Sequence, residues 1–147
     1  MKLYIIRGLP ASGKSTIANK LISESCENQV CKESFFEADM FFCINLVGEY
    51  RFDPSKLSDA HKWCQNKVRE SLAEGRNTIV ANTFTQKWEM EPYVVMAREL
   101  NAEIEVIDVF DGGLSDAELA ARNVHKVPEE VIGRMRERYQ HDISTLV

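Results

Sequence analysis

The sequence predicts an α/β fold, a three-layer α/β/α sandwich around a mainly parallel central sheet. Short apolar runs alternate with helix-like patterns along the chain, without a repeat, a low-complexity stretch or a Gly/Ser linker between them. A glycine-rich loop, Gly8–Thr16, directly follows the first apolar run, Leu3–Ile6, and opens the first helix. Strands that alternate with helices form a parallel sheet covered on both faces, so we expect one domain over residues 1–147.

The first expected helix and the second expected strand follow this loop. The helix runs from Lys14 to about Glu24 and turns one apolar face inward. That face consists of Ile17, Ala18, Leu21 and Ile22. Residues Glu33–Glu37 form the expected strand, which ends at Ala38 and Asp39.

A longer helix is predicted before the third strand. Asp53 supplies an N-cap, Pro54 a first-turn proline, and Gly75 ends the helix. Its apolar stripe consists of Leu57, His61, Cys64, Val68 and Leu72. The strand Asn77–Asn82 has a continuously apolar centre, as expected of a strand buried on both faces, so we place it beside the first strand.

Three further elements continue the alternation. A helix over Glu89–Leu100 tolerates Pro92 only because this proline falls in its first turn. The strand Ile104–Phe110 carries charged side chains, which indicate an edge position in the sheet. Ser115 and Glu118 have the spacing of a capping box, which predicts the start of a short helix.

Composition and charge limit the class of protein. The 147 residues include 44% apolar and 28% charged residues, which is typical of a globular domain. The net charge of −5 excludes an overall basic field for long nucleic acids, so a nucleic-acid substrate would be held at an end. Four apolar residues before Arg7 are too few for a signal peptide or a membrane span. The four cysteines have no metal or disulfide spacing, so we expect reduced thiols and a cytoplasmic location.

The glycine-rich loop has the Walker A pattern of nucleotide-binding proteins. Gly8 and Gly13 let the backbone curl until consecutive N–H groups point at phosphates, and the following helix adds its positive end. Lys14 is expected to reach the β- and γ-phosphates of ATP, and the Ser15 hydroxyl to bind Mg²⁺. The expected nucleotide-binding residues are Gly8, Pro10, Ala11, Ser12, Gly13, Lys14, Ser15 and Thr16.

Two further side chains are candidates for phosphoryl transfer. Asp39 follows the second strand, where a carboxylate can face a cleft and accept the proton of an attacking hydroxyl, and an N-cap role is the alternative. Arg122 precedes the final helix, which Pro128 opens and whose stripe consists of Val131, Ile132, Met135 and Tyr139. Segment 122–138 holds five Lys or Arg against three Asp or Glu. We therefore expect a positive helical lid that places Arg122 on the γ-phosphate.

The ordered motifs resemble the small P-loop kinases of the polynucleotide 5′-hydroxyl kinase-like family, related to zeta-toxin/AAA-type ATP-binding domains and to the amino-terminal domain of cyclic-nucleotide phosphodiesterase. The motifs that carry the resemblance are Gly8–Thr16, Glu37–Phe41, Tyr50–Pro54, Asn82–Thr85, Trp88–Met90 and Arg122–Pro128. The resemblance implies a kinase-like P-loop fold with a helical lid. It also implies that Lys14 and Ser15 hold the triphosphate and Mg²⁺, that Asp39 is the general base and that Arg122 is the lid arginine.

The chain departs from this family at two places. Relatives often have Asp-Asn-Thr-Asn where this chain has Ala81-Asn82-Thr83-Phe84, and Phe84 can either stack on a base or join the core. Met40 stands where relatives often have a second Asp, which weakens the case for an acidic metal pair. The candidate substrate contacts are Asn82, Thr83, Phe84, His125 and Lys126.

The leading function is transfer of the ATP γ-phosphate to a hydroxyl acceptor, either a polynucleotide 5′-OH end or a nucleotide-like molecule. An ATP-binding regulatory or adaptor protein with little turnover is the first alternative, and a small-metabolite kinase is the second. No membrane contact is expected. A kinase of this length is expected to act alone or with separate proteins.

Overall fold

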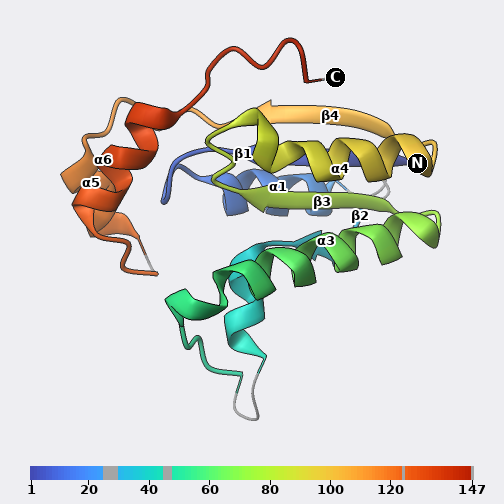
Figure 1. The fold of residues 1–147 in the computed structure, drawn as a ribbon, viewed down its shortest axis with the longest axis horizontal. Coiled ribbons are helices and arrows are strands. Elements are labelled where there is room, and N and C mark those ends of the chain that lie inside the picture. Colours follow the sequence, from blue (N-terminus) through green and yellow to red (C-terminus); the bar gives the residue numbers. More distant parts are fainter. Residues whose placement is uncertain (25–29, 45–47, 124, 147) are drawn as a thin grey trace.

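The computed structural model describes residues 1–24, 30–44, 48–123 and 125–146. Its centre is a parallel sheet of four strands in the order β2-β3-β1-β4 (Figure 1). The strands are β1 (Lys2–Arg7), β2 (Val30–Phe36), β3 (Asn77–Asn82) and β4 (Glu103–Asp108). The predicted pairing of the first and third strands and the edge position of the last strand are both confirmed.

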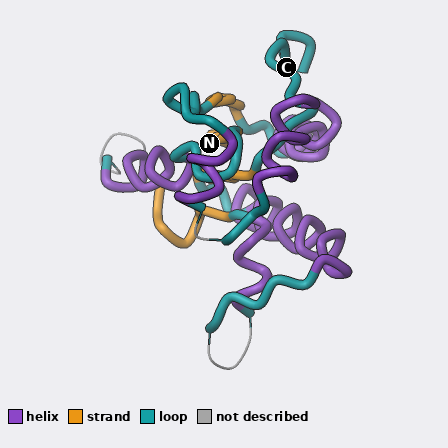
Figure 2. Tube along the Cα trace, turned by 90° about the vertical axis from the view of Figure 1, so that its left-hand side faces the viewer, coloured by secondary structure: helices purple, strands orange, loops and turns teal. Residues whose placement is uncertain are grey.

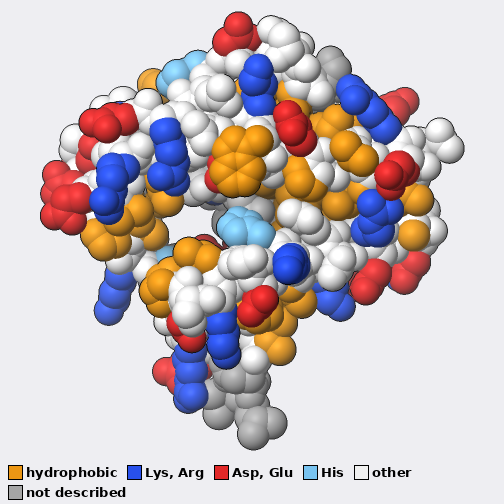
Figure 3. All heavy atoms as spheres, viewed as in Figure 1, with side chains coloured by type: hydrophobic (Ala, Val, Ile, Leu, Met, Phe, Trp, Pro, Cys, Tyr) orange, Lys and Arg blue, Asp and Glu red, His pale blue; other side chains and the backbone are white. Residues whose placement is uncertain are grey.

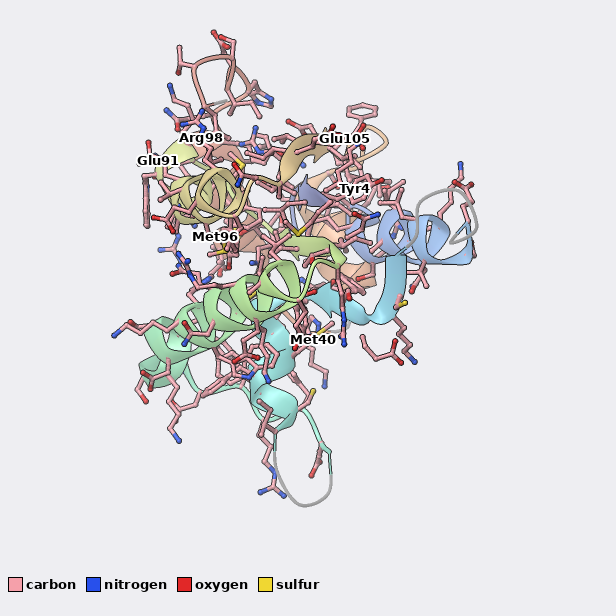
Figure 4. All side chains as sticks on the ribbon, turned by 90° about the vertical axis from the view of Figure 1, so that its right-hand side faces the viewer. Tyr4, Met40, Glu91, Met96, Arg98 and Glu105 are labelled. Carbon is pink, nitrogen blue, oxygen red and sulfur yellow. The ribbon has the colours of Figure 1, made fainter. Side chains whose placement is uncertain are left out.

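Helices cover both faces of this sheet (Figure 2). The helices are α1 (Lys14–Ser23), α3 (Leu57–Ala73), α4 (Lys87–Glu99), α5 (Asp116–Arg122) and α6 (Glu129–Arg138), with short 3-10 helices η1 (Ala38–Cys43) and η2 (Pro54–Lys56). Side chains alternate along β1, so that Leu3 and Ile5 pack with α3 and α4, whereas Tyr4 and Ile6 pack with α1. Met96 points from α4 toward α3, while Arg98 points away (Figure 4). The predicted three-layer α/β/α fold is confirmed.

The start of α3 differs from the prediction. Asp53 and Pro54 begin the separate helix η2, where the Asp53 carboxylate accepts a hydrogen bond from the Ser55 N–H. Leu57 and His61 are exposed, because the buried face of α3 follows Ala60 and the residues four apart from it. The buried stripe instead consists of Ala60, Cys64, Val68 and Leu72.

Three other boundaries were wrong by two or three residues, one of them the end of β4, which is Asp108 rather than Phe110. The second strand begins at Val30 rather than Glu33, with an irregular register against β3. Helix α4 begins at Lys87, so Pro92 lies in its second turn and not in the first. The Glu89 carboxylate accepts a hydrogen bond from the Gln86 N–H, which fixes this earlier start.

The structure adds three observations on the remaining sequence expectations. Among the described residues, no helix is both long and apolar enough to cross a membrane. Cys31, Cys43 and Cys64 are free thiols, and Cys26 lies outside the described residues. Tyr139, expected on the last helix, immediately follows α6.

Candidate active site

The phosphate-binding loop, Gly8–Thr16, connects β1 with α1 at the carboxyl ends of the strands. A Cβ atom on Gly8 would lie 2.5 Å from Ser12 Oγ and 3.1 Å from the Val109 carbonyl oxygen, so a larger residue would require these neighbours to shift. Gly13 precedes α1 with a φ of 108°, a left-handed conformation that strains other residues. The loop thus has the tight curvature that an anion-binding loop needs.

Lys14 lies across this loop. Its Nζ donates hydrogen bonds to the carbonyl oxygens of Gly8 and Leu9, both at 2.9 Å. Burial lowers the pKa of the Lys14 ammonium to about 8, and the carboxylates of Glu37 and Asp39 act in the opposite direction. The cation is therefore held at the loop by weak neutral acceptors, which the oxygens of a phosphate can replace.

Glu37 contacts the loop from the end of β2. The Ser15 hydroxyl donates a hydrogen bond of 2.9 Å to Glu37 Oε1. Burial raises the pKa of the Glu37 carboxyl, while the hydrogen bond from Ser15 and the charge of Lys14 oppose the rise. Glu37 is not among the site residues predicted from the sequence, although carboxyl ends of parallel strands meet at one edge of a sheet.

Asp39 lies in the first turn of η1 and faces residues from two other segments. The Tyr50 hydroxyl donates a long hydrogen bond of 3.4 Å to Asp39 Oδ1, and His125 Nε2 lies 3.8 Å from Asp39 Oδ2. The rings of Tyr50 and His125 are tilted against each other with centroids 4.4 Å apart. Burial and the Asp39 carboxylate raise the pKa of Tyr50 to about 12. The N-cap position of η1 belongs to Glu37, so the N-cap alternative for Asp39 is wrong.

The three residues at the end of β3 that are expected to contact the substrate also have partners within the protein. The Asn82 side chain accepts a hydrogen bond of 2.9 Å from the Ala38 N–H, which ties β3 to η1 beside Asp39. The Thr83 carbonyl accepts a bond from the Gly8 N–H. Phe84 is only 3% exposed and packs edge-on against a buried tyrosine, so its expected contact with a substrate base is corrected to a core role.

The lid consists of α5, α6 and the segment that connects them. It stands beyond the carboxyl ends of the strands (Figure 1), and the molecular surface is hollowed between this side and the rest of the molecule (Figure 3). Leu9 of the phosphate-binding loop packs with Leu119 of α5 and Ile132 of α6. Arg122 ends α5 and is exposed, as is Lys126. The base of the lid is therefore packed directly on the loop.

Buried Arg7 connects the start of the phosphate-binding loop with other segments at the carboxyl ends of the strands. It follows the apolar part of β1 and is fully buried. Its guanidinium donates hydrogen bonds to the carbonyl oxygens of Phe84, Thr85 and Gln140 and forms an ion pair with Asp108 at 3.2 Å. In the sequence, Arg7 is recognisable only as the residue that ends an apolar run.

The possible metal ligands at this site are few. Across the described residues, no group of three or more His, Cys, Asp or Glu side chains is arranged to hold a metal ion. The oxygens of Ser15 and Glu37 do lie together beside the phosphate-binding loop. Magnesium binds through one or two protein oxygens together with substrate phosphates and water, so these residues fit a nucleotide-bound Mg²⁺.

Comparison with known sequences identifies related proteins. A family model described as "AAA domain" matches residues 3–141. NEDD4-binding protein 2 from Homo sapiens is 35% identical over 144 residues, which are 97% of this chain. The aligned part is 8% of that protein, so the chain spans less than a tenth of the length of this relative.

Solved structures share the fold. A chain of the Pnkp1/Rnl/Hen1 RNA repair complex has a TM-score of 0.69 and 22% identity, over 98% of this chain and 45% of that chain. A putative kinase from Chloroflexus aurantiacus has a TM-score of 0.61 and 17% identity, over 95% of this chain and 69% of the other. A gluconokinase from Sinorhizobium meliloti has a TM-score of 0.56 and 16% identity, over 95% of this chain and 75% of the gluconokinase chain. The expected P-loop kinase-like fold is confirmed.

Proposed function

This chain belongs to the AAA domain family, and from this premise we propose that it transfers the γ-phosphate of ATP to a hydroxyl group, on a polynucleotide 5′ end or a nucleotide-like molecule. The observation that carries the proposal is the position of Asp39. Its carboxylate lies on the same edge of the sheet as Lys14 and Ser15, and it faces the lid residue His125. Phosphoryl transfer needs a base and a phosphate-binding loop on the two sides of one cleft.

The phosphate-binding loop holds the nucleotide in this proposal. Backbone N–H groups at the end of this loop and at the start of α1 bind the phosphates. Lys14 exchanges the carbonyl oxygens of the loop for phosphate oxygens, which gives its charge a stronger partner. Mg²⁺, held by Ser15, neutralises charge on the β- and γ-phosphates when it is bound.

Asp39 acts as the general base for the acceptor hydroxyl. Its carboxylate takes the proton from the acceptor hydroxyl while that oxygen forms a bond to the γ-phosphorus, and the bond from phosphorus to the β–γ bridging oxygen breaks to release ADP. Tyr50 and His125 contact Asp39 and fix the direction of its oxygens. Arg122 stabilises the negative charge on the phosphoryl group from the lid.

The surroundings of Asp39 support a nucleotide-like acceptor. Phe52 is 49% exposed, packs on Phe42 with ring centroids 5.1 Å apart, and lies two residues from Tyr50. An exposed aromatic ring can stack on a base, and the exposed lysine Lys126 can bind a phosphate. The fold shared with a chain of an RNA repair complex is consistent with this acceptor class.

The test is transfer of labelled γ-phosphate from Mg-ATP to 5′-hydroxyl DNA and RNA oligonucleotides, nucleosides and a metabolite pool. Asp39→Asn removes the base with little change in shape and should reduce transfer about 100-fold or more while ATP still binds. Lys14→Ala should abolish ATP binding. Asp59→Asn makes the same chemical change on the exposed first turn of α3 and should leave transfer unchanged.

Each result decides between the functions. Label on an oligonucleotide end, lost in the Asp39 and Lys14 variants, supports the proposal. Full transfer by Asp39→Asn would overturn the assigned base. Label only on a small metabolite would make the chain a small-molecule kinase. ATP binding without any labelled acceptor would favour a regulatory protein.

A further inference from the structure

We propose that Glu37 provides the carboxylate that holds Mg²⁺ beside Ser15, so that this chain takes its metal-binding acid from the end of β2. The inference rests on the proposed binding of Mg-ATP and extends it to a residue that the sequence motifs do not assign. In P-loop enzymes the loop hydroxyl binds Mg²⁺ together with a carboxylate from a neighbouring strand. Glu37 is the carboxylate that contacts the loop hydroxyl here.

The geometry of the Ser15–Glu37 pair fits a shared cation. A hydroxyl has one proton to donate and two lone pairs, and the Ser15 proton is directed at Glu37 Oε1. The lone pairs of Ser15 therefore remain available to an ion. Adjacent ligands of an octahedral Mg²⁺ lie about 3 Å apart, since each is ~2.1 Å from the metal. The two oxygens are 2.9 Å apart.

Other carboxylates near the strand ends have different partners. Asp39 faces Tyr50 and His125 on the lid side. Asp108 is bound by Arg7 and by the Tyr139 hydroxyl. The strand β3 ends in an amide side chain that is bound to the backbone of η1.

Asp111, after β4, forms an ion pair of 2.6 Å with Arg136. Met40 follows Asp39 on η1 (Figure 4) and adds no charge. Of these acids, Glu37 is the one with a direct hydrogen bond to the phosphate-binding loop. The two carboxylates after β2 thus have separate tasks, Glu37 toward the nucleotide and Asp39 toward the acceptor.

The decisive measurement is the dissociation constant of labelled ATP, determined by equilibrium dialysis with EDTA and with Mg²⁺. Glu37→Gln keeps the size of the side chain and an oxygen that can accept from Ser15, but it removes the charge that binds a cation. We expect its affinity in EDTA to stay within about twofold of the unmodified chain. Tightening by Mg²⁺ means the factor by which Mg²⁺ lowers the dissociation constant of ATP. This factor should be about 10-fold to 100-fold smaller in Glu37→Gln than in the unmodified chain. Glu33→Gln is the matched control on the exposed part of β2 and should behave as the unmodified chain.

A second readout follows the metal itself. Mn²⁺ gives an electron paramagnetic resonance signal when free, so the ion that binds together with ATP can be counted directly. Glu37→Asp, which retains a shorter carboxylate, should bind more Mn²⁺ than Glu37→Gln. This order separates a charge that holds the metal from a side chain that merely supports the fold, and circular dichroism confirms that each variant is folded.

The outcomes separate the two proposals. Normal Mg²⁺ tightening and normal Mn²⁺ binding in Glu37→Gln would overturn the role of Glu37 and leave phosphoryl transfer intact. Reduced tightening supports the role of Glu37 even if no acceptor is ever labelled. Absence of ATP binding, or of any tightening by Mg²⁺, in the unmodified chain would overturn both proposals.

Discussion

Arg7 is a fully buried arginine at the junction of β1 and the phosphate-binding loop. Its five donors serve three backbone carbonyls and Asp108, and the Tyr139 ring lies 4.1 Å from the guanidinium carbon. A buried charge is tolerated only when it is paired and hydrogen-bonded, and every side of this guanidinium has a partner. Arg7 therefore joins β1, the segment after β3 and the chain after α6 into one rigid edge beneath the site.

Replacement of Arg7 should destabilise the whole domain. Arg7→Met retains the apolar length but leaves Asp108 and several carbonyls without their donor, so we expect a loss of about 3–5 kcal/mol in the free energy of unfolding. Urea denaturation followed by circular dichroism measures this loss. Arg69→Met removes an arginine from an exposed pair with Glu99 and should cost less than about 1 kcal/mol. Equal losses in the two variants would contradict the structural role of Arg7.

The lowered pKa of Lys14 predicts that ATP binding depends on pH. Its pKa in the nucleotide-free protein is about 8, so the loop loses its cation as the pH rises above 8. We expect the ATP dissociation constant to be flat near pH 7 and to rise by up to about tenfold per pH unit above 8. Measurements at pH 7, 8 and 9 test this, and Lys14→Ala should show no ATP binding at any of these pH values.

The lowered pKa of Lys14 also makes the free energy of unfolding depend on pH. Because the folded pKa of Lys14 is lowered, the folded chain loses this proton near pH 8, whereas the unfolded chain keeps it until about 10.5. The contribution of Lys14 to the free energy of unfolding therefore increases with pH between these values. Lys14→Met should remove that increase in denaturation experiments between pH 8 and 10.

At the scale of elements, we expect the contact between the lid and the phosphate-binding loop to matter for the proposed activity. Leu119 of α5 is fully buried against Leu9 of the loop. Leu119→Ala should cost about 2–5 kcal/mol and leave a cavity where the lid meets the loop. Leu72→Ala opens a similar cavity under α3, in a separate core cluster that does not include the lid.

We expect the two variants to lose comparable stability but different amounts of function. At a temperature where both remain folded, Leu119→Ala should weaken ATP binding or phosphate transfer at least severalfold more than Leu72→Ala. Thermal unfolding and ATP titration provide the two measurements. If both cavities affected ATP binding equally, the position of the lid would not depend on its contact with the loop.

Local sequence patterns predicted most elements correctly because the signals are local. The capping box of Ser115 and Glu118 starts α5 as expected. The errors occur where tertiary contacts set the boundary. Gln86 is outside the preferred N-cap residues, so the true start of α4 gave no clear signal. Strand β2 extends to Val30 because it pairs there with Asn77, a contact 47 positions away in the chain.

For the whole molecule, the sequence identified the edge of the sheet that carries the site but missed several of its contacts. Lys14, Ser15 and Asp39 could be placed together because parallel strands direct their carboxyl ends to one edge. Glu37 and Tyr50 were missed as site residues, since their contacts with Ser15 and Asp39 join segments that are distant in sequence. A pattern of apolar residues cannot reveal such contacts between polar side chains.

The charge distribution of the whole molecule limits how a polynucleotide would bind. The chain has a net charge of −5, so a broad electrostatic attraction to nucleic acid is not expected. The exposed cations Arg122 and Lys126 lie in the lid, close in sequence to His125, which reaches Asp39. Binding should therefore depend on one or two phosphates near the acceptor end.

This arrangement predicts a shallow salt dependence for binding of a single-stranded 5′-hydroxyl oligonucleotide. Two phosphate contacts give a slope of about −1.4 for the logarithm of the association constant against the logarithm of salt concentration. Lys126→Ala should reduce the magnitude of the slope by about 0.7, whereas Lys20→Ala, on the last turn of α1, should not change it. Fluorescence anisotropy at several salt concentrations measures these slopes. A slope steeper than about −4 would require a long basic track, which is incompatible with contact at a single end.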